Sequence, residues 1–111
     1  FVEQDRRAAS VIALNLRLLE FSCRVVTGTV VRFLAAREEQ VFDLIFMDPP
    51  YHNDEEKERL AGTDIVRLLA PGGRLVYEAS RKEEPPVFAG LSRVASRSYG
   101  DTVLHFFEKP A

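Results

Sequence analysis

The sequence predicts an α/β fold with a mostly parallel sheet and at least one antiparallel strand near the C-terminus. Three observations support this prediction. Short apolar runs alternate with segments of helical periodicity through residue 79, as in βαβ units. Turn-forming residues such as Pro71-Gly72-Gly73 separate these segments. Two further β-rich runs flank Tyr99-Gly100-Asp101, and strands joined by so short a connection pair antiparallel.

Length and composition indicate a single globular domain over residues 1–111. The apolar fraction of 46% and the charged fraction of 29% are typical of globular proteins. No apolar run approaches the roughly 20 residues needed to span a membrane. The lone Cys23 cannot form an internal disulfide, which favours a reducing, cytoplasmic location. A net charge of -2 provides no overall basic field for nucleic acid.

The first third of the chain is expected to hold two strands and two helices. Phe1-Val2-Glu3 indicates the end of a strand. Asp5 can cap the helix that follows, because its side chain can accept from unpaired N–H groups. That helix covers residues 6 to about 21, where apolar side chains recur near helical spacing. A β-branched strand at residues 24–27 and a short helix at residues 30–37 complete this part.

The middle of the chain predicts a buried strand followed by a polar loop and a helix. Residues 41–47 are mostly apolar, as expected for a strand covered on both faces. The acidic run within residues 52–59 indicates a loop and then a helix reaching about residue 70, and it is interpreted as a solvated face, not a metal site. Pro71-Gly72-Gly73 ends this helix. The remaining strands are expected at residues 74–79, 91–98 and 102–108.

Asp48-Pro49-Pro50-Tyr51, directly after the strand at 41–47, is the strongest chemical signal. It offers a carboxylate, a carbonyl aimed by rigid proline, and an aromatic face, which together suit a planar base with an exocyclic amino group. Glu3 stands at another strand end, where carboxylates of nucleotide-binding folds accept from ribose hydroxyls. The alternative is a simple strand-ending turn, since Pro commonly ends strands. A third signal, the helix, stop and strand of residues 68–76, follows along the chain, and the three together at these spacings favour a functional site.

These motifs resemble those of the RsmD-like 16S ribosomal RNA (guanine-N2)-methyltransferases, which use adenosylmethionine. Residues 1–8 resemble that family's second-strand motif, and residues 42–51 resemble its catalytic motif. Residues 99–104 resemble its closing hairpin, which favours this family over the DNA adenine methylases that share the catalytic tetrad. The resemblance implies a Rossmann-like methyltransferase fold with an antiparallel C-terminal strand.

The resemblance also implies that a first strand and its Gly-rich loop are missing before Phe1. None of the six glycines forms a G-x-G after a strand. In the family's sheet the first strand lies between the second and the fourth, so its loss would expose two inner edges. Such edges invite association. The sequence therefore predicts an N-terminally incomplete domain that binds cofactor poorly by itself.

The resemblance implies roles for individual residues. The target-base pocket would be formed by Asp48, Pro49, Pro50 and Tyr51. The cofactor S-adenosyl-L-methionine would be bound by Glu3 at its ribose, by Gln4 beside its adenine, by Thr29 and Val30 at the adenine edge, and by Asp48. Many relatives carry Asp where Thr29 stands. No metal is expected.

The implied partner is 16S ribosomal RNA or the assembling small ribosomal subunit, in the cytoplasm and without a membrane. Two alternatives stay open from the residues. One is a DNA adenine-N6 methyltransferase or another amine methyltransferase with the same tetrad. The other is a non-catalytic fragment of such a fold.

Overall fold

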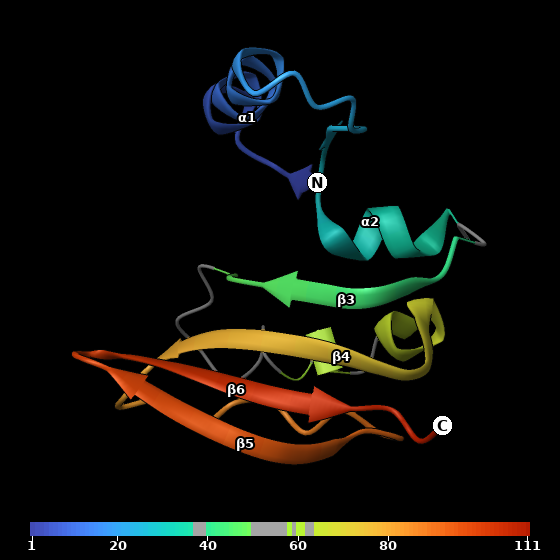
Figure 1. The fold of residues 1–111 in the computed structure, drawn as a ribbon, viewed down its shortest axis with the longest axis vertical. Coiled ribbons are helices and arrows are strands. Elements are labelled where there is room, and N and C mark those ends of the chain that lie inside the picture. The colour runs from blue at the N-terminus through green and yellow to red at the C-terminus, as the bar shows by residue number, and fades with distance from the viewer. Residues whose placement is uncertain (37–39, 50–57, 59, 62–63) are drawn as a thin grey trace. The chain divides into compact units, whose positions relative to one another are not determined.

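A computed structural model describes residues 1–36, 40–49, 58, 60–61 and 64–111. The chain divides into two compact units, Phe1–Glu38 and Glu39–Ala111, and each is described by itself (Figure 1). The expectation that residues 1–111 form one domain stays a prediction. Among the helices within these described ranges, none is long and apolar enough to cross a membrane.

The first unit is a short βαβ arrangement followed by a second helix. It contains β1 (Val2–Glu3), α1 (Arg6–Leu18), β2 (Val26–Thr27) and α2 (Val30–Ala35). β1 and β2 pair in parallel, with Val2 opposite Val26 and Glu3 opposite Thr27. Two parallel strands need a crossover between them, and α1 supplies it. The predicted parallel pairing of these strands is confirmed.

Helix α1 begins where the sequence predicts and ends earlier. Asp5 is its N-cap, and its carboxylate accepts a hydrogen bond of 3.1 Å from the Arg7 N–H. The helix ends at Leu18 instead of near residue 21, and Glu20 adopts a left-handed φ of 59°. The Phe21 N–H then donates to the Leu16 carbonyl at 2.9 Å, so the chain has already turned away.

The second unit is built on a four-stranded sheet. Its strands are β3 (Phe42–Met47), β4 (Leu69–Ser80), β5 (Ser92–Tyr99) and β6 (Thr102–Glu108), in the spatial order β3-β4-β6-β5. β3 and β4 are parallel, whereas β6 is antiparallel to both β4 and β5. The predicted C-terminal hairpin is therefore confirmed. β3 lies at an edge of this sheet, and β1–β2 form a separate sheet.

The segment around Pro71-Gly72-Gly73 differs from the prediction. We expected a helix as far as residue 70, but a 3-10 helix, η1, covers Asp64–Leu68, and Leu69 already pairs with Phe42 in the sheet. The strand pairing shifts register and resumes at Arg74. The predicted turn therefore becomes an irregularity inside β4. Pairing with β3 outweighs helix propensity here, because propensity is the weaker constraint.

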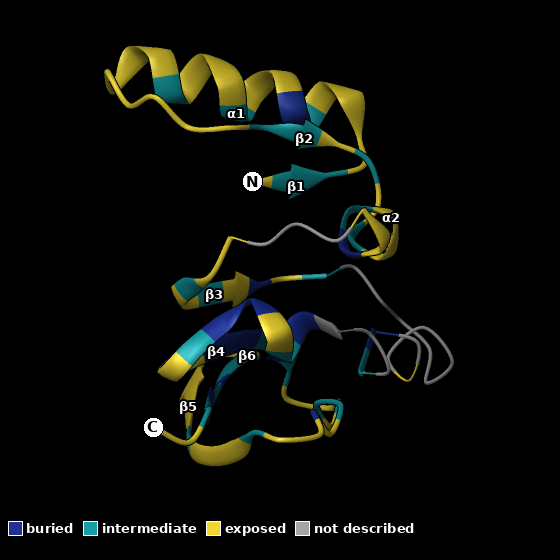
Figure 2. Ribbon diagram, turned by 90° about the vertical axis from the view of Figure 1, so that its right-hand side faces the viewer, coloured by how far each residue is buried: buried dark blue, intermediate teal, exposed yellow. Residues whose placement is uncertain are grey.

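The core of the second unit lies against β4, half of whose residues are buried (Figure 2), and it contains an aromatic cluster. The Phe88 ring lies 6.2 Å from the Tyr77 ring and 5.2 Å from the Phe107 ring, between centroids. His105 is buried beside them and its Nδ1 lies 2.8 Å from the Ser96 hydroxyl oxygen.

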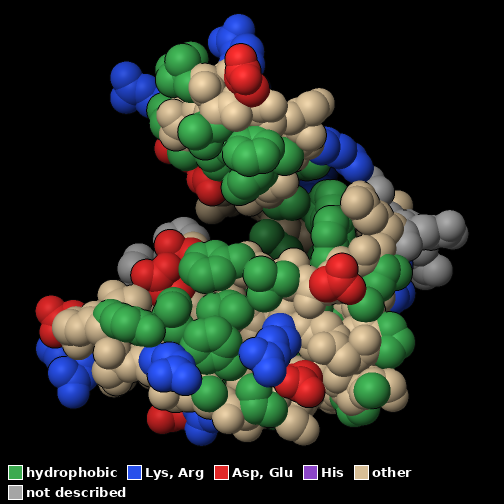
Figure 3. All heavy atoms as spheres, in the orientation of Figure 1, with side chains coloured by type: hydrophobic (Ala, Val, Ile, Leu, Met, Phe, Trp, Pro, Cys, Tyr) green, Lys and Arg blue, Asp and Glu red, His purple; other side chains and the backbone are tan. Residues whose placement is uncertain are grey.

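Strand β3 is not covered on both faces, contrary to the prediction. Leu44 and Phe46 are 60% and 59% exposed, whereas Met47 is only 7% exposed. In the view of Figure 3, hydrophobic side chains gather over the sheet of the second unit, with Arg and Lys side chains among them. One face of the strand is thus exposed in the part of the chain that the structure describes.

Gly73→Ala is expected to destabilise the protein by about 1–3 kcal/mol, because a new methyl group would overpack the backbone. A Cβ at this position would lie 2.7 Å from the Ala70 carbonyl oxygen and 3.2 Å from that of Asp43. Gly28→Ala is the matched control, since nothing lies within 4 Å of its added Cβ. Urea unfolding of both variants measures the difference. Equal stabilities would contradict the close approach.

Lys109→Met is expected to cost about 2 kcal/mol or more, because two hydrogen bonds to a charged donor are lost. The Lys109 Nζ donates to the Val66 carbonyl at 3.0 Å and to the Leu69 carbonyl at 2.8 Å. Val66 lies within η1 and Leu69 is the first residue of β4, so Lys109 joins the chain end to the junction between these two elements. Lys82→Met, at an exposed position, is the control for loss of charge. Chemical denaturation with matching midpoints for both variants would refute this role.

Candidate active site

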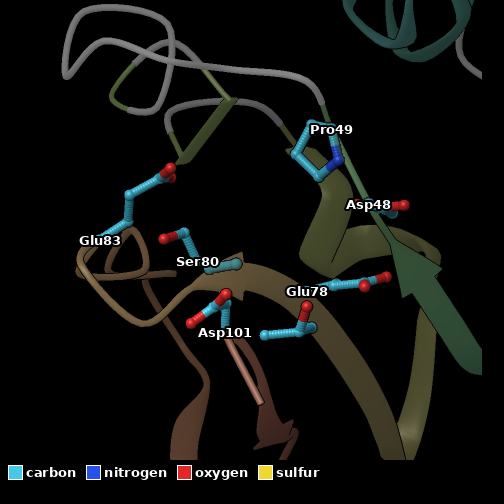
Figure 4. Close-up of a pocket in the computed structure, with 8 residues that line it drawn as sticks. Asp48, Pro49, Glu78, Ser80, Glu83 and Asp101 are labelled. Carbon is cyan, nitrogen blue, oxygen red and sulfur yellow. The ribbon is translucent and has the colours of Figure 1, made fainter. Parts of the chain in front are cut away.

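Asp48 and Pro49 directly follow β3 and line a cavity of about 260 Å³ in the second unit (Figure 4). The structure therefore places the first half of the predicted tetrad in a pocket. Pro50 and Tyr51 lie outside the described residues, so their predicted roles stay predictions. The cavity is lined by Asp48, Pro49, Glu78, Ala79, Ser80, Glu83, Asp101 and Thr102.

The parallel pairing of β3 with β4 explains why this cavity forms. Met47 is opposite Tyr77, so the next residues, Asp48 and Glu78, stand side by side at the carboxyl ends of the two strands. This is the edge where α/β sheets bind their ligands. The Arg81 N–H donates to the Asp101 carbonyl at 2.9 Å, which joins the end of β4 to the β5–β6 turn.

Two carboxyl groups meet in this cavity. Burial raises the pKa of Glu78 above its ordinary value of 4.5, and the charge of Asp48 and a hydrogen bond to that carboxyl raise it further. Glu78 is half-buried and Asp48 is exposed. Adjacent carboxyls resist simultaneous ionisation. When ionised, each of the two can accept a hydrogen bond from an N–H group.

The sequence prediction did not include Glu78 as a site residue, although its position near the end of a strand indicated this role. The predicted strand at 74–79 is parallel to the strand that ends at Asp48. The carboxyl ends of neighbouring parallel strands lie at one edge of a sheet, so a polar residue near the end of the second strand is a natural candidate. Among the described residues, no three His, Cys, Asp or Glu side chains are placed to hold a metal ion.

The predicted cofactor residues gather at the end of β1 in the first unit. Glu3 is half-buried there, and one of its carboxylate oxygens accepts a 3.3 Å hydrogen bond from the Asp5 N–H. The Gly28 N–H donates to the Glu3 carbonyl at 2.9 Å, so the turn leading to Thr29 and Val30 starts beside Glu3. Gln4 follows Glu3 and is exposed. Asp48, the fifth of these residues, belongs to the other unit.

Thr29 stabilises the start of helix α2. It is the N-cap of α2, and its hydroxyl oxygen accepts from the Arg32 N–H at 3.2 Å. A hydroxyl keeps its own O–H as a donor and a further lone pair while it caps. The Glu3 carboxylate likewise retains acceptor capacity at a strand end. The predicted contacts of these groups with the ribose and adenine of a cofactor stay predictions.

The chain matches the family model described as "Conserved hypothetical protein 95" over residues 1–108. It is 32% identical over 114 residues to the "Putative rRNA methyltransferase YlbH" of Bacillus subtilis, covering 98% of this chain and 62% of that protein. It is 28% identical over 89 residues to the "Ribosomal RNA small subunit methyltransferase D" of Haemophilus influenzae, covering 77% of this chain and 46% of that protein. The chain thus spans less than two thirds of the length of either relative.

Solved structures agree on the fold. The "Putative methyltransferase yhhF" from Escherichia coli superposes with a TM-score of 0.76 at 23% identity, over 99% of this chain and 63% of that chain. A methylase structure from Haemophilus influenzae gives 0.75 at 20% identity, over 100% of this chain and 71% of that one. The predicted Rossmann-like methyltransferase fold is confirmed. The chain belongs to the conserved hypothetical protein 95 family, which is the RsmD family.

Proposed function

We propose that this chain carries the target-base pocket of an adenosylmethionine-dependent methyltransferase that modifies an exocyclic amine, guanine N2 of 16S ribosomal RNA. One observation carries the proposal: Asp48 and Pro49 line a cavity at the carboxyl end of β3 in a chain of this family. The names of the two relatives, both ribosomal RNA methyltransferases, support the substrate class. The activity is proposed for the protein in its natural full length.

Residues of the first unit would hold the methyl donor. The Glu3 carboxylate would accept from the ribose hydroxyls, as carboxylates at strand ends do in related folds. Gln4, Thr29 and Val30 would contact the adenine. When bound, adenosylmethionine would supply a methyl group that its sulfonium centre activates. The sulfur would leave as a neutral thioether while the amine takes the methyl group.

Asp48 and Pro49 would prepare the amine. The lone pair of guanine N2 is delocalised into the ring, so the nitrogen must pyramidalise before it can attack. The Asp48 carboxylate and the Pro49 carbonyl would each accept one amino hydrogen, which aims the lone pair at the methyl group. The same two oxygens would stabilise the positive charge that develops on N2. Asp48 would also receive the proton that N2 releases after methylation.

The substrate must expose its base to this cavity. A base inside a helix has to leave its stack before a pocket can surround it. Tyr51, which lies outside the described part of the chain, would stack on the extruded base, and such stacking is worth about 1–3 kcal/mol. An RNA or small-subunit substrate would also place the protein in the cytoplasm.

Asp48→Ala is expected to slow single-turnover methyl transfer by roughly 10- to 150-fold while sparing adenosylmethionine affinity. One charge-assisted hydrogen bond is worth about 1.5–3 kcal/mol, and each 1.4 kcal/mol is about tenfold in rate. Labelled methyl donor and the natural full-length protein give the rate, and calorimetry gives the affinity. Asp43→Ala is the matched control, because this exposed carboxylate lies on the same strand outside the cavity. A near wild-type rate for Asp48→Ala would remove Asp48 from the mechanism.

The substrate itself is tested with three nucleic acids: naked 16S RNA, assembled small subunits, and duplex DNA. Nuclease digestion and mass spectrometry identify the methylated nucleoside in each. N2-methylguanosine from one of the two RNA substrates is the expected product. Methylated adenine, or methylation of the DNA alone, would overturn the proposed substrate and leave the amine chemistry standing.

A further inference from the structure

The proposed chemistry uses Asp48 and Pro49 and leaves Glu78 without a task. Glu78 lines the same cavity and stands beside Asp48 on the neighbouring strand (Figure 4). On neighbouring parallel strands, these two carboxylates can each meet one of the two adjacent N–H groups on one edge of a purine.

The rest of the cavity also favours a donor-rich ligand. Its side chains include the carboxylates of Glu83 and Asp101 and the hydroxyls of Ser80 and Thr102, with no Lys or Arg among the described residues that line it. No three of the carboxylates in the described ranges are placed to hold a metal ion. A neutral heterocycle presenting N–H groups fits these conditions, because each N–H can meet one carboxylate oxygen.

We infer that Glu78 is a specificity-determining residue that accepts the N1–H of the guanine whose N2 amino group Asp48 holds. This inference rests on the proposed function. Guanine offers N1–H and N2–H donors side by side, whereas N1 of adenine is an acceptor. N1 of adenine would face the Glu78 carboxylate, and neither of these two acceptors would then have a hydrogen-bond donor in the cavity. Sites that hydrogen-bond a substrate N–H reject analogues without it by large factors.

The ionised form of Glu78 is the one that fits this role. Burial and the charge of Asp48 raise the pKa of Glu78, so ionising both carboxyls is unfavourable in the cavity. Glu83 and Asp101 also face the cavity, from the β4–β5 loop and the β5–β6 turn. Two guanine N–H groups would offset the repulsion of the pair, because each carboxylate then accepts a hydrogen bond. Guanine binding should therefore strengthen as the pH rises through the raised pKa of Glu78.

The test compares guanine with 2-aminopurine at the methylated position of an RNA substrate. 2-Aminopurine keeps the 2-amino group, but its N1 is an acceptor. The wild-type protein should methylate guanine at least ~100-fold faster. In Glu78→Gln the amide N–H can donate to N1 of 2-aminopurine, so the ratio of the two rates should fall at least tenfold. Intrinsic reactivity differences between the bases cancel when ratios from two proteins are compared.

Glu84→Gln is the matched control, because Glu84 is exposed and lies outside the cavity. It should keep the wild-type ratio. A Glu78→Gln variant that loses rate on both bases equally would show a structural role and overturn the inference. Should that variant not fold, Glu78→Asp retains a carboxylate and must lose guanine rate while keeping the preference for guanine. A wild-type protein that methylates no guanine would overturn the proposed function instead.

Discussion

The parallel pairing of β3 with β4 is the constraint on which the candidate site depends. With Met47 opposite Tyr77, β3 ends beside Glu78, which lies near the carboxyl end of the parallel strand β4. A slip of one residue would move Glu78 to the other face of the sheet and away from Asp48. The two carboxyls therefore meet because the strand register brings them together. Their own interaction would separate them whenever both are ionised.

Buried residues outside the cavity fix that register. Leu75 and Tyr77, at the centre of β4, are 0% and 2% exposed, so shifting the strand would expose a packed core. At its start, β4 follows an irregular path through Gly72, whose φ of 75° suits a residue without a side chain. The Gly72 N–H donates to the Lys109 carbonyl at 3.0 Å, which fastens this irregularity to the chain end beyond β6.

Sequence alone could predict the features that depend on neighbours along the chain. The Asp5 cap, the β5–β6 hairpin and the position of Asp48 at a strand end all follow from local patterns, and the structure agrees. Leu69 could not be placed in this way, because its pairing with Phe42 joins residues far apart in the chain and outweighs the local helical pattern. Glu78 could not be predicted for the same reason, because its position beside Asp48 depends on the pairing of β4 with β3.

The fold alone does not explain the carboxyl pair of Asp48 and Glu78, whereas a bound ligand does. An acid whose pKa is raised in the folded state binds more protons there than in the unfolded chain. Folding stability must then fall as the pH rises from 4.5 through the folded pKa of Glu78. A neutral side chain at this position would avoid that loss. Perturbed pKa values of this kind cluster at functional sites, where a ligand can offset the cost. Two N–H groups on one base edge would do so, because each carboxylate then accepts a hydrogen bond instead of repelling its neighbour.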